Sequence, residues 1–182
     1  LKTPTCDFGN NAKDFELNST DNNLVTLNDI KGKKGTLIMF ICNHCPYVKA
    51  VIEDIIEDCE KLKKFEIRAV AISSNDTLNY PEDSFKNMIK FSKEQQFNFP
   101  YLFDESQKVA ESYKAVCTPD FFGYNKDLQL QYRGRIRELK NLKTVRAGES
   151  DLFKAMKQIS ETNIGPKDQT PSMGCSIKWL NK

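Results

Sequence analysis

The sequence contains a single histidine, a single tryptophan and no long hydrophobic run. Its continuously apolar stretch at 36–41 is far shorter than the ~20 residues that cross a bilayer, so we expect no membrane partner. A net charge of +2 gives no strong attraction for acidic partners. The basic stretch at 133–146 lacks interleaved aromatic residues and is typical of a solvated loop or helix face. We therefore expect no nucleic-acid partner.

Six cysteines are few for a chain of this length, because disulfide-stapled scaffolds are shorter and denser in cysteine. Hydrophobic residues make up 39% of the 182 positions, which is enough for a single domain over residues 1–182. No signal-peptide hydrophobic segment stands at the N-terminus. We therefore expect a cytoplasmic protein. Because the chain begins at Leu1 rather than Met, the alternative is a periplasmic protein whose leader was removed before Leu1.

The hydrophobic pattern predicts an α/β fold. Continuously apolar runs at 36–41 and 67–72 are typical of strands buried on both faces of a sheet. Apolar residues recur at helical spacing over 48–62, which predicts a right-handed βαβ unit. The expected architecture is a mixed central sheet with helices on both faces. The flanking elements are predicted as an N-terminal hairpin at 15–27, an αβ stretch, a hairpin at 121–132, a last helix capped by Ser150, and an irregular tail from 165.

Cys42 and Cys45 stand at the junction between the first buried strand and the first long helix, in the spacing of a redox motif. Unpaired N–H groups and the dipole at a helix N-terminus stabilise a thiolate. We expect Cys42 to lie exposed as the nucleophile and Cys45 to lie deeper as the resolving thiol. His44, as imidazolium, would favour the Cys42 thiolate, or else would only face solvent. Lys49 would add positive potential, or be an ordinary solvated lysine.

Other residues are candidates because the fold brings their loops toward the cysteines. Asn75 follows the second buried strand at the carboxyl edge of the sheet, where it either rims the substrate site or serves loop structure. Pro119 follows Thr118 just before a hairpin strand. Because only ~5% of X-Pro bonds are cis, the residue pattern alone predicts a trans bond there. We expect substrate contacts from Asn43, Thr118, Lys49 and Asn75.

The remaining cysteines have less distinctive surroundings. Cys59 falls on the apolar stripe of the predicted helix and is expected in the core. Cys6 precedes the folded region and is expected to be exposed, and Cys117 is expected to pack. Cys175 either relays the disulfide from a flexible tail or is a buried thiol that docks the tail.

These residues together resemble the thioredoxin superfamily, and more narrowly its redoxin branch, which includes the alkyl hydroperoxide reductases. A bacterial subgroup of probable thiol-disulfide isomerase or thioredoxin-like proteins is similar in five motifs. They are residues 42–49 (Cys-Asn-His-Cys-Pro-Tyr-Val-Lys), 80–83 (Tyr-Pro-Glu-Asp), 118–119 (Thr-Pro), 134–135 (Gly-Arg) and 174–179 (Gly-Cys-Ser-Ile-Lys-Trp).

The resemblance implies a thioredoxin-like fold, with Cys42 attacking, Cys45 resolving and Pro119 in a cis-proline loop beside them. The sequence departs from ordinary thioredoxin in three places. Ile41 stands where thioredoxin has tryptophan, Asn43-His44 replaces Gly-Pro, and no carboxylate lies within 36–41.

The leading hypothesis is a thiol-disulfide oxidoreductase without metal or organic cofactor. Its partners would be a protein or small-molecule disulfide substrate and a thiol electron donor or acceptor. A thiol peroxidase with antioxidant activity is the first alternative. Peroxiredoxins use Pro-x-x-x-Thr/Ser-x-x-Cys, but counting back from Cys42 gives Gly35 and Met39, which do not fit.

A metal-binding domain is the second alternative, with ligands from Cys42, His44, Cys45 and Cys175. The two-residue gap with His44 inside it is poor geometry for three ligands at once.

Overall fold

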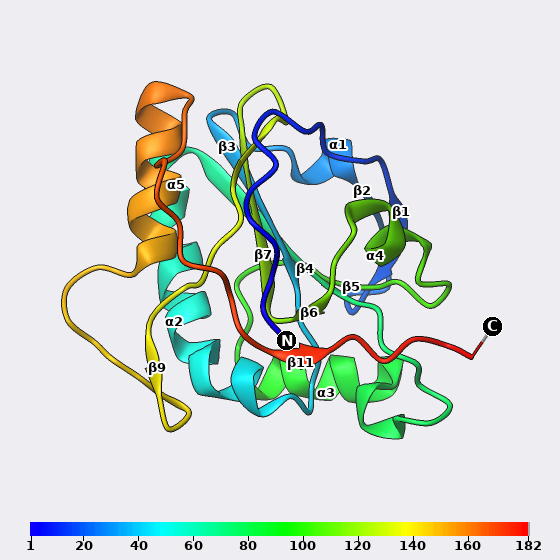
Figure 1. Ribbon diagram of the computed structural model, residues 1–182. Coiled ribbons are helices and arrows are strands. Elements are labelled where there is room, and N and C mark those ends of the chain that lie inside the picture. The colour runs from blue at the N-terminus through cyan, green and yellow to red at the C-terminus, as the bar shows by residue number, and fades with distance from the viewer. Residues whose placement is uncertain (182) are drawn as a thin grey trace.

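The computed structural model describes residues 1–181 and has a central seven-stranded sheet with helices against both faces (Figure 1). The strand order is β2-β1-β5-β4-β3-β7-β8. The strands of this sheet are β1 (Glu16–Ser19), β2 (Leu24–Thr26), β3 (Gly35–Phe40), β4 (Ile67–Ser73), β5 (Tyr101–Phe103), β7 (Asp120–Asn125) and β8 (Leu130–Tyr132). Strands β3, β4 and β5 run parallel, whereas β7 pairs antiparallel with β3 and β1 pairs antiparallel with β5. The mixed sheet agrees with the sequence prediction.

Within residues 1–181 there are five α-helices, of which the first four lie between strands of this sheet in the chain and the fifth follows them. They are α1 (Leu27–Ile30), α2 (Pro46–Leu62), α3 (Phe85–Glu94), α4 (Lys108–Tyr113) and α5 (Asp151–Thr162), with short 3-10 helices at Lys63–Phe65 and Pro81–Asp83. Ser150 caps α5 as predicted, because its side chain accepts a hydrogen bond from Phe153 N. None of the helices in the described residues is both long and apolar enough to span a bilayer.

Alternating side chains of β3 divide the core into two layers. Leu37 and Met39 pack with α2, α3 and α5 on one face. Ile38 and Phe40 pack with α1 and α4 on the other. Because both faces are covered, β3 is apolar from Leu37 to Phe40, and the buried Thr36 hydroxyl accepts a hydrogen bond from Gly32 N.

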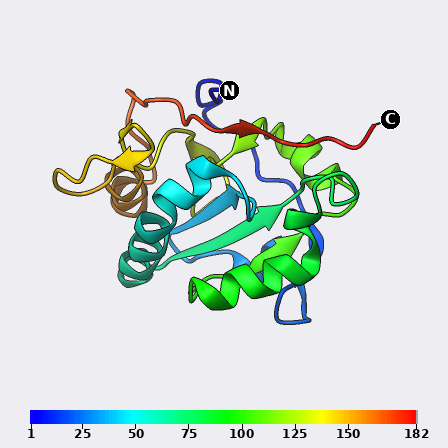
Figure 2. The ribbon, with the colours of Figure 1, turned by 90° about the horizontal axis from the view of Figure 1, so that it is seen from below.

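The C-terminal tail lies across the end of the sheet at which α2 begins (Figures 1 and 2). The tail contains a short strand, β11 (Cys175–Ser176), paired antiparallel with β6 (Cys117–Thr118). Ile177 is buried in the second core layer, and the carbonyl of Lys178 accepts hydrogen bonds from Asp76 N and Gln107 Nε2. The tail is therefore docked along its length, whereas the sequence pattern predicts only an irregular segment.

The basic stretch at 133–146 is not simply a solvated face, contrary to the sequence prediction. It holds a small hairpin of β9 (Leu139–Lys140) and β10 (Lys143–Thr144). Arg133 is buried and Arg137 half-buried, and they pair with the buried Asp120 at 2.9 Å and Asp54 at 2.8 Å. Two arginines of this stretch thus neutralise acids that folding removes from water.

Candidate redox site

Cys42 and Cys45 lie between the end of β3 and the start of α2. Cys45 is the N-cap residue of α2, which begins at Pro46, so Cys42 stands three residues ahead of the cap. The Cys45 thiol donates to the Thr118 carbonyl at 3.2 Å, and Cys42 Sγ lies 3.5 Å from Thr118 Oγ1. The expectation that Cys42 is exposed was wrong, because Cys42 is 1% exposed and Cys45 0%.

The two thiols act on each other's pKa. The interaction with Cys45, burial and the nearby Asp83 carboxylate raise the pKa of Cys42. The interaction with Cys42 lowers the pKa of Cys45 against the effect of burial, with further help from the Thr118 and Cys175 side chains. These directions make Cys45 the more acidic thiol of the pair in this structure.

Asp83 belongs to the site, although the sequence analysis gave it no role beyond its place in the motif at 80–83. It is fully buried in the 3-10 helix Pro81–Asp83, and its carboxylate accepts hydrogen bonds from Asn43 N at 2.8 Å and Asn75 Nδ2 at 2.8 Å. Nδ1 of His44 lies 2.6 Å from Asp83 Oδ2. By comparison with thioredoxin, a carboxylate would be expected only within 36–41. This one comes instead from a loop about 40 residues further along the chain.

The side chains of Asn43 and Asn75 are occupied within the fold. Asn43 is 8% exposed; its amide donates to the Glu82 carbonyl, and its oxygen accepts from Tyr101 OH at 2.8 Å. Asn75 is 4% exposed and also accepts from Lys178 N at 3.0 Å. These residues position Asp83 and the tail in this structure, and their contact with a substrate stays a prediction.

Thr118 and Pro119 form the loop that faces the cysteines. The peptide bond between them is cis, so the trans bond predicted from residue pattern alone was wrong and the geometry is that implied by the family resemblance. Thr118 is paired with Cys175 across β6 and β11, so the tail already occupies its backbone groups. Lys49 is exposed, and its described contact with the motif is a main-chain hydrogen bond to the Cys45 carbonyl.

The other cysteines are packed within the fold. Cys59 and Cys117 are 3% and 0% exposed, and burial raises the pKa of each thiol. Cys6 is half-buried rather than exposed, and burial raises its pKa to about 11. Cys175 is half-buried and packs against the core cluster that contains Cys42 and Cys45.

Among the described residues, one group of side chains could hold a metal ion. Ligand atoms of Cys42, His44 and Asp83 all lie within 4.8 Å of one another. The sequence hypothesis had instead joined Cys42 and His44 to Cys45 and Cys175. Thiolate, imidazole and carboxylate together form a donor set that suits zinc.

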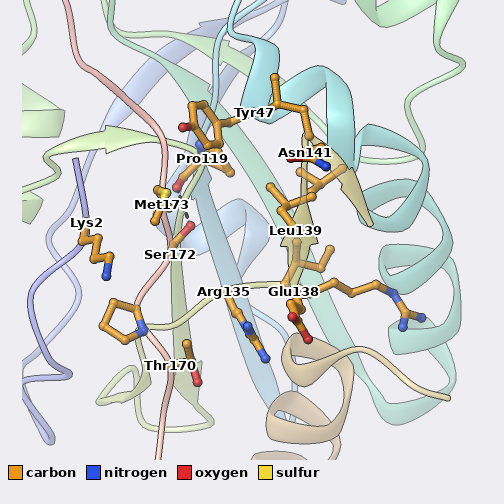
Figure 3. Close-up of a pocket in the computed structure, with 15 residues that line it drawn as sticks. Lys2, Tyr47, Pro119, Arg135, Glu138, Leu139, Asn141, Thr170, Ser172 and Met173 are labelled. Carbon is orange, nitrogen blue, oxygen red and sulfur yellow. Dashed lines mark hydrogen bonds between the residues drawn. The ribbon is translucent and has the colours of Figure 1, made fainter. Parts of the chain in front are cut away.

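A cavity of about 470 Å³ reaches Tyr47 and Pro119, which are close in the chain to Cys45 and Thr118, although neither Cys42 nor Cys45 lines it. Figure 3 shows Tyr47 of α2 and Pro119 at one end of it, with Met173 of the tail and Leu139 of β9 along its sides. The lining is mainly apolar and also includes Lys2, Arg135, Arg137 and Glu138. Sequence reasoning did not predict this cavity, because several separate segments converge to form it.

Comparison with known proteins supports the fold and places the chain in a family. Residues 8–138 match the AhpC/TSA family. An uncharacterized conserved protein from Geobacillus kaustophilus is 39% identical with a TM-score of 0.95, over 100% of this chain and 97% of that one. A hypothetical protein from Sinorhizobium meliloti is 32% identical with a TM-score of 0.91, over 100% and 99%.

A more distant structure has the same fold. The thioredoxin domain of a thiol-disulfide oxidoreductase from Bacteroides vulgatus is 19% identical with a TM-score of 0.59, over 76% of this chain and 91% of that one. No curated protein matches the chain. The family match covers well over half of the sequence, and the chain, which has a thioredoxin-like fold, thus belongs to the AhpC/TSA family.

Proposed function

We propose that the protein is a thiol-disulfide oxidoreductase whose redox pair is Cys42 and Cys45. The observation that carries this proposal is that both thiols meet Thr118 at the start of α2, with Cys42 Sγ 3.5 Å from its hydroxyl and the Cys45 thiol donating to its carbonyl at 3.2 Å. Two cysteines at this spacing can close into a disulfide. A helix N-terminus also favours the thiolate that disulfide exchange requires.

The raised pKa of Cys42 and the lowered pKa of Cys45 suggest how the Cys42 proton moves. Cys42 attacks a substrate disulfide while its proton passes to the Cys45 thiolate, and the first substrate thiolate leaves. That thiolate takes the proton from Cys45. Cys45 then attacks Cys42 Sγ, which forms the Cys42–Cys45 disulfide and releases the second substrate thiolate. The substrate gains two electrons and the enzyme loses two, and the reverse sequence would oxidise a dithiol.

The cavity beside Tyr47 and Pro119 supports a substrate with apolar groups next to its disulfide, such as a protein segment. Cys42 is 1% exposed. Before Cys42 can attack directly, the tail must move aside or the substrate must displace it. A thiol donor or acceptor then returns the pair to its starting state. No metal or organic cofactor takes part in these steps.

The first test is the reduction potential of the pair, measured by equilibration in glutathione buffers and mass-spectrometric counting of free thiols. A potential of about −200 mV or higher would support an oxidant or isomerase, and one near about −270 mV would support a reductase. Failure of Cys42 and Cys45 to form a mutual disulfide at any potential would overturn the proposal.

The matched variants are Cys42→Ser and Cys59→Ser. Cys42→Ser should abolish turnover of a disulfide substrate. Cys59→Ser should retain it, because Cys59 is a core residue further along the same helix and outside the redox motif. Equal loss in both variants would indicate a folding defect, and retention of activity by Cys42→Ser would contradict the proposed role.

Metal binding is the second candidate function, and the grouping of Cys42, His44 and Asp83 is the observation in its favour. Elemental analysis of protein purified without chelator separates the two functions. Stoichiometric zinc or copper that is lost in Asp83→Asn would support a metal site. Metal well below one equivalent per chain would leave the redox function as the better account.

We expect little peroxidase activity, since Gly35 and Met39 stand where peroxiredoxins have proline and threonine or serine. The test is hydrogen peroxide consumption with a thiol reductant. Saturable turnover that requires Cys42 would contradict this expectation.

A further inference from the structure

The tail pairs with the edge of β6 through β11, as a bound extended peptide would. Cys175 is in register with Thr118, and Ser176 with Cys117. Gly174 packs so closely that a Cβ there would fall 2.0 Å from the Thr118 oxygen. Ser172 Oγ adds a hydrogen bond to the Pro119 carbonyl at 2.8 Å. The register of β11 is therefore fixed, and it presents the Cys175 side chain to the redox pair.

Thr118 brings three thiols together. The Cys45 thiol donates to the Thr118 carbonyl at 3.2 Å, and Cys42 Sγ lies 3.5 Å from Thr118 Oγ1. Cys175 is the register partner of Thr118 and packs against the core cluster that contains Cys42 and Cys45. The three sulfurs therefore gather around Thr118.

Of these three cysteines, Cys175 is the one that solvent reaches. Cys42 and Cys45 are 1% and 0% exposed, whereas Cys175 is half-buried. A disulfide between Cys42 and Cys45 would be shielded by the docked tail. A disulfide that includes Cys175 would present a sulfur at the surface.

We propose that Cys175 is a third redox thiol, which exchanges with the Cys42–Cys45 disulfide to form a Cys45–Cys175 disulfide. This inference rests on the proposed function of the Cys42/Cys45 pair. The Cys175 thiolate attacks Cys45 Sγ, the Cys42–Cys45 bond breaks, and Cys42 leaves as the thiolate that takes up the proton lost by Cys175. No net oxidation occurs, because one disulfide replaces another.

The exchange delivers the disulfide to the outside of the protein. A substrate thiolate attacks Cys175 Sγ, forms a mixed disulfide and releases the Cys45 thiolate. A second substrate thiolate then releases Cys175 and closes the substrate disulfide. The substrate class is accordingly a dithiol that reaches Cys175 without displacing the tail, and the reverse steps would reduce a disulfide at the same place.

Disulfide mapping of the full chain tests the proposal. The protein is oxidised with glutathione disulfide, quenched in acid, alkylated and cleaved with trypsin without reduction. Cys42 and Cys45 lie in the tryptic peptide 35–49, and Cys175 lies in 168–178. We expect wild type to yield both the internally bridged peptide 35–49 and a product that joins 35–49 to 168–178.

Variants assign the linkage. Cys42→Ser should form Cys45–Cys175 almost completely, as monomer on a non-reducing gel. Cys175→Ser should form only Cys42–Cys45. Cys117→Ser is the matched control and should map like wild type, because Cys117 is buried in the neighbouring register position opposite Ser176. Cys42→Ala repeats the test in case serine perturbs folding.

The outcomes separate the two proposals. If Cys175→Ser forms Cys42–Cys45 but neither wild type nor the Cys42 variants join 35–49 to 168–178, the relay is wrong and the proposed function stands. If Cys175→Ser cannot form Cys42–Cys45, the proposed function fails.

Discussion

The carboxylate of Asp83 lies 2.6 Å from Nδ1 of His44, and the Asp83 side chain has no exposed surface. The only histidine of the chain is therefore paired with an acid, and the charge of that acid also acts on Cys42. The sequence had suggested that His44 favours the Cys42 thiolate. The pairing means that Asp83 opposes this effect, since a negative charge disfavours a second negative charge nearby.

Asp83→Asn should therefore make Cys42 more acidic. Removing the carboxylate charge stabilises the thiolate, so the midpoint of Cys42 alkylation should move to lower pH by about one unit. The measurement is the pH dependence of iodoacetamide labelling, resolved by residue with tandem mass spectrometry. Asp76→Asn changes an acid to an amide in the same loop and should leave the midpoint near that of wild type. A midpoint that rises in Asp83→Asn would contradict the assigned sign.

Gly174→Ala should uncover the redox pair. The added methyl would fall 2.0 Å from the Thr118 oxygen, so β11 cannot stay in register against β6. Because the pKa of Cys45 is lowered, its thiolate should react once water reaches it. We expect alkylation of Cys45 at neutral pH to accelerate about tenfold, which corresponds to docking weakened by about 1.4 kcal/mol.

Gly148→Ala is the control for Gly174→Ala. Gly148 has a positive φ of 72° but no atom within 4 Å of the added methyl, so the change strains the backbone without a clash near the tail. Comparable acceleration in both variants would show that tail docking does not control access to Cys45.

Arg133→Met should destabilise the fold by about 3 kcal/mol or more, because it leaves Asp120 buried without its partner. Methionine keeps most of the side-chain volume over the Phe122 ring, on which the Arg133 guanidinium rests at 4.4 Å. Urea unfolding gives the free energy. Lys140→Met removes a charge that is 71% exposed and should cost less than about 1 kcal/mol. Similar losses in both variants would contradict the argument from burial.

Asp58 should make stability depend on pH. Burial raises its pKa from 3.8 to about 6, although Ser150 donates a hydrogen bond to it. Since the folded-state pKa is above the unfolded value, this contribution is present below pH about 4 and is lost as pH rises through about 6. Relative to wild type, Asp58→Asn should gain about 2–3 kcal/mol in unfolding free energy between pH 4 and pH 7. A difference that stays constant over this range would contradict the prediction.

Sequence reasoning predicted best where a pattern repeats over several residues. The apolar runs of β3 and β4 and the helical spacing of α2 each carry many independent signals, and these elements form as predicted. The spacing of Cys42 and Cys45 is also a local signal, because two residues so close in the chain stay close however the distant segments pack.

The rest depends on contacts between distant segments. Strand β11 has only two residues and pairs with β6 nearly 60 positions earlier, so no local period reveals it. Asp83 reaches Cys42 through the packing of a separate loop, and no spacing rule connects them. The burial of Cys42 follows from these same contacts, which explains why its exposure was predicted wrongly.

The docked tail also carries Trp179, the only tryptophan of the chain. Trp179 is 41% exposed and follows Lys178, whose main chain is hydrogen-bonded to Asn75 and Gln107. All tryptophan emission of the protein therefore originates beside the segment that covers the cysteines. Fluorescence intensity and anisotropy, excited near the red edge of tyrosine absorption, would follow tail opening in real time without any attached label.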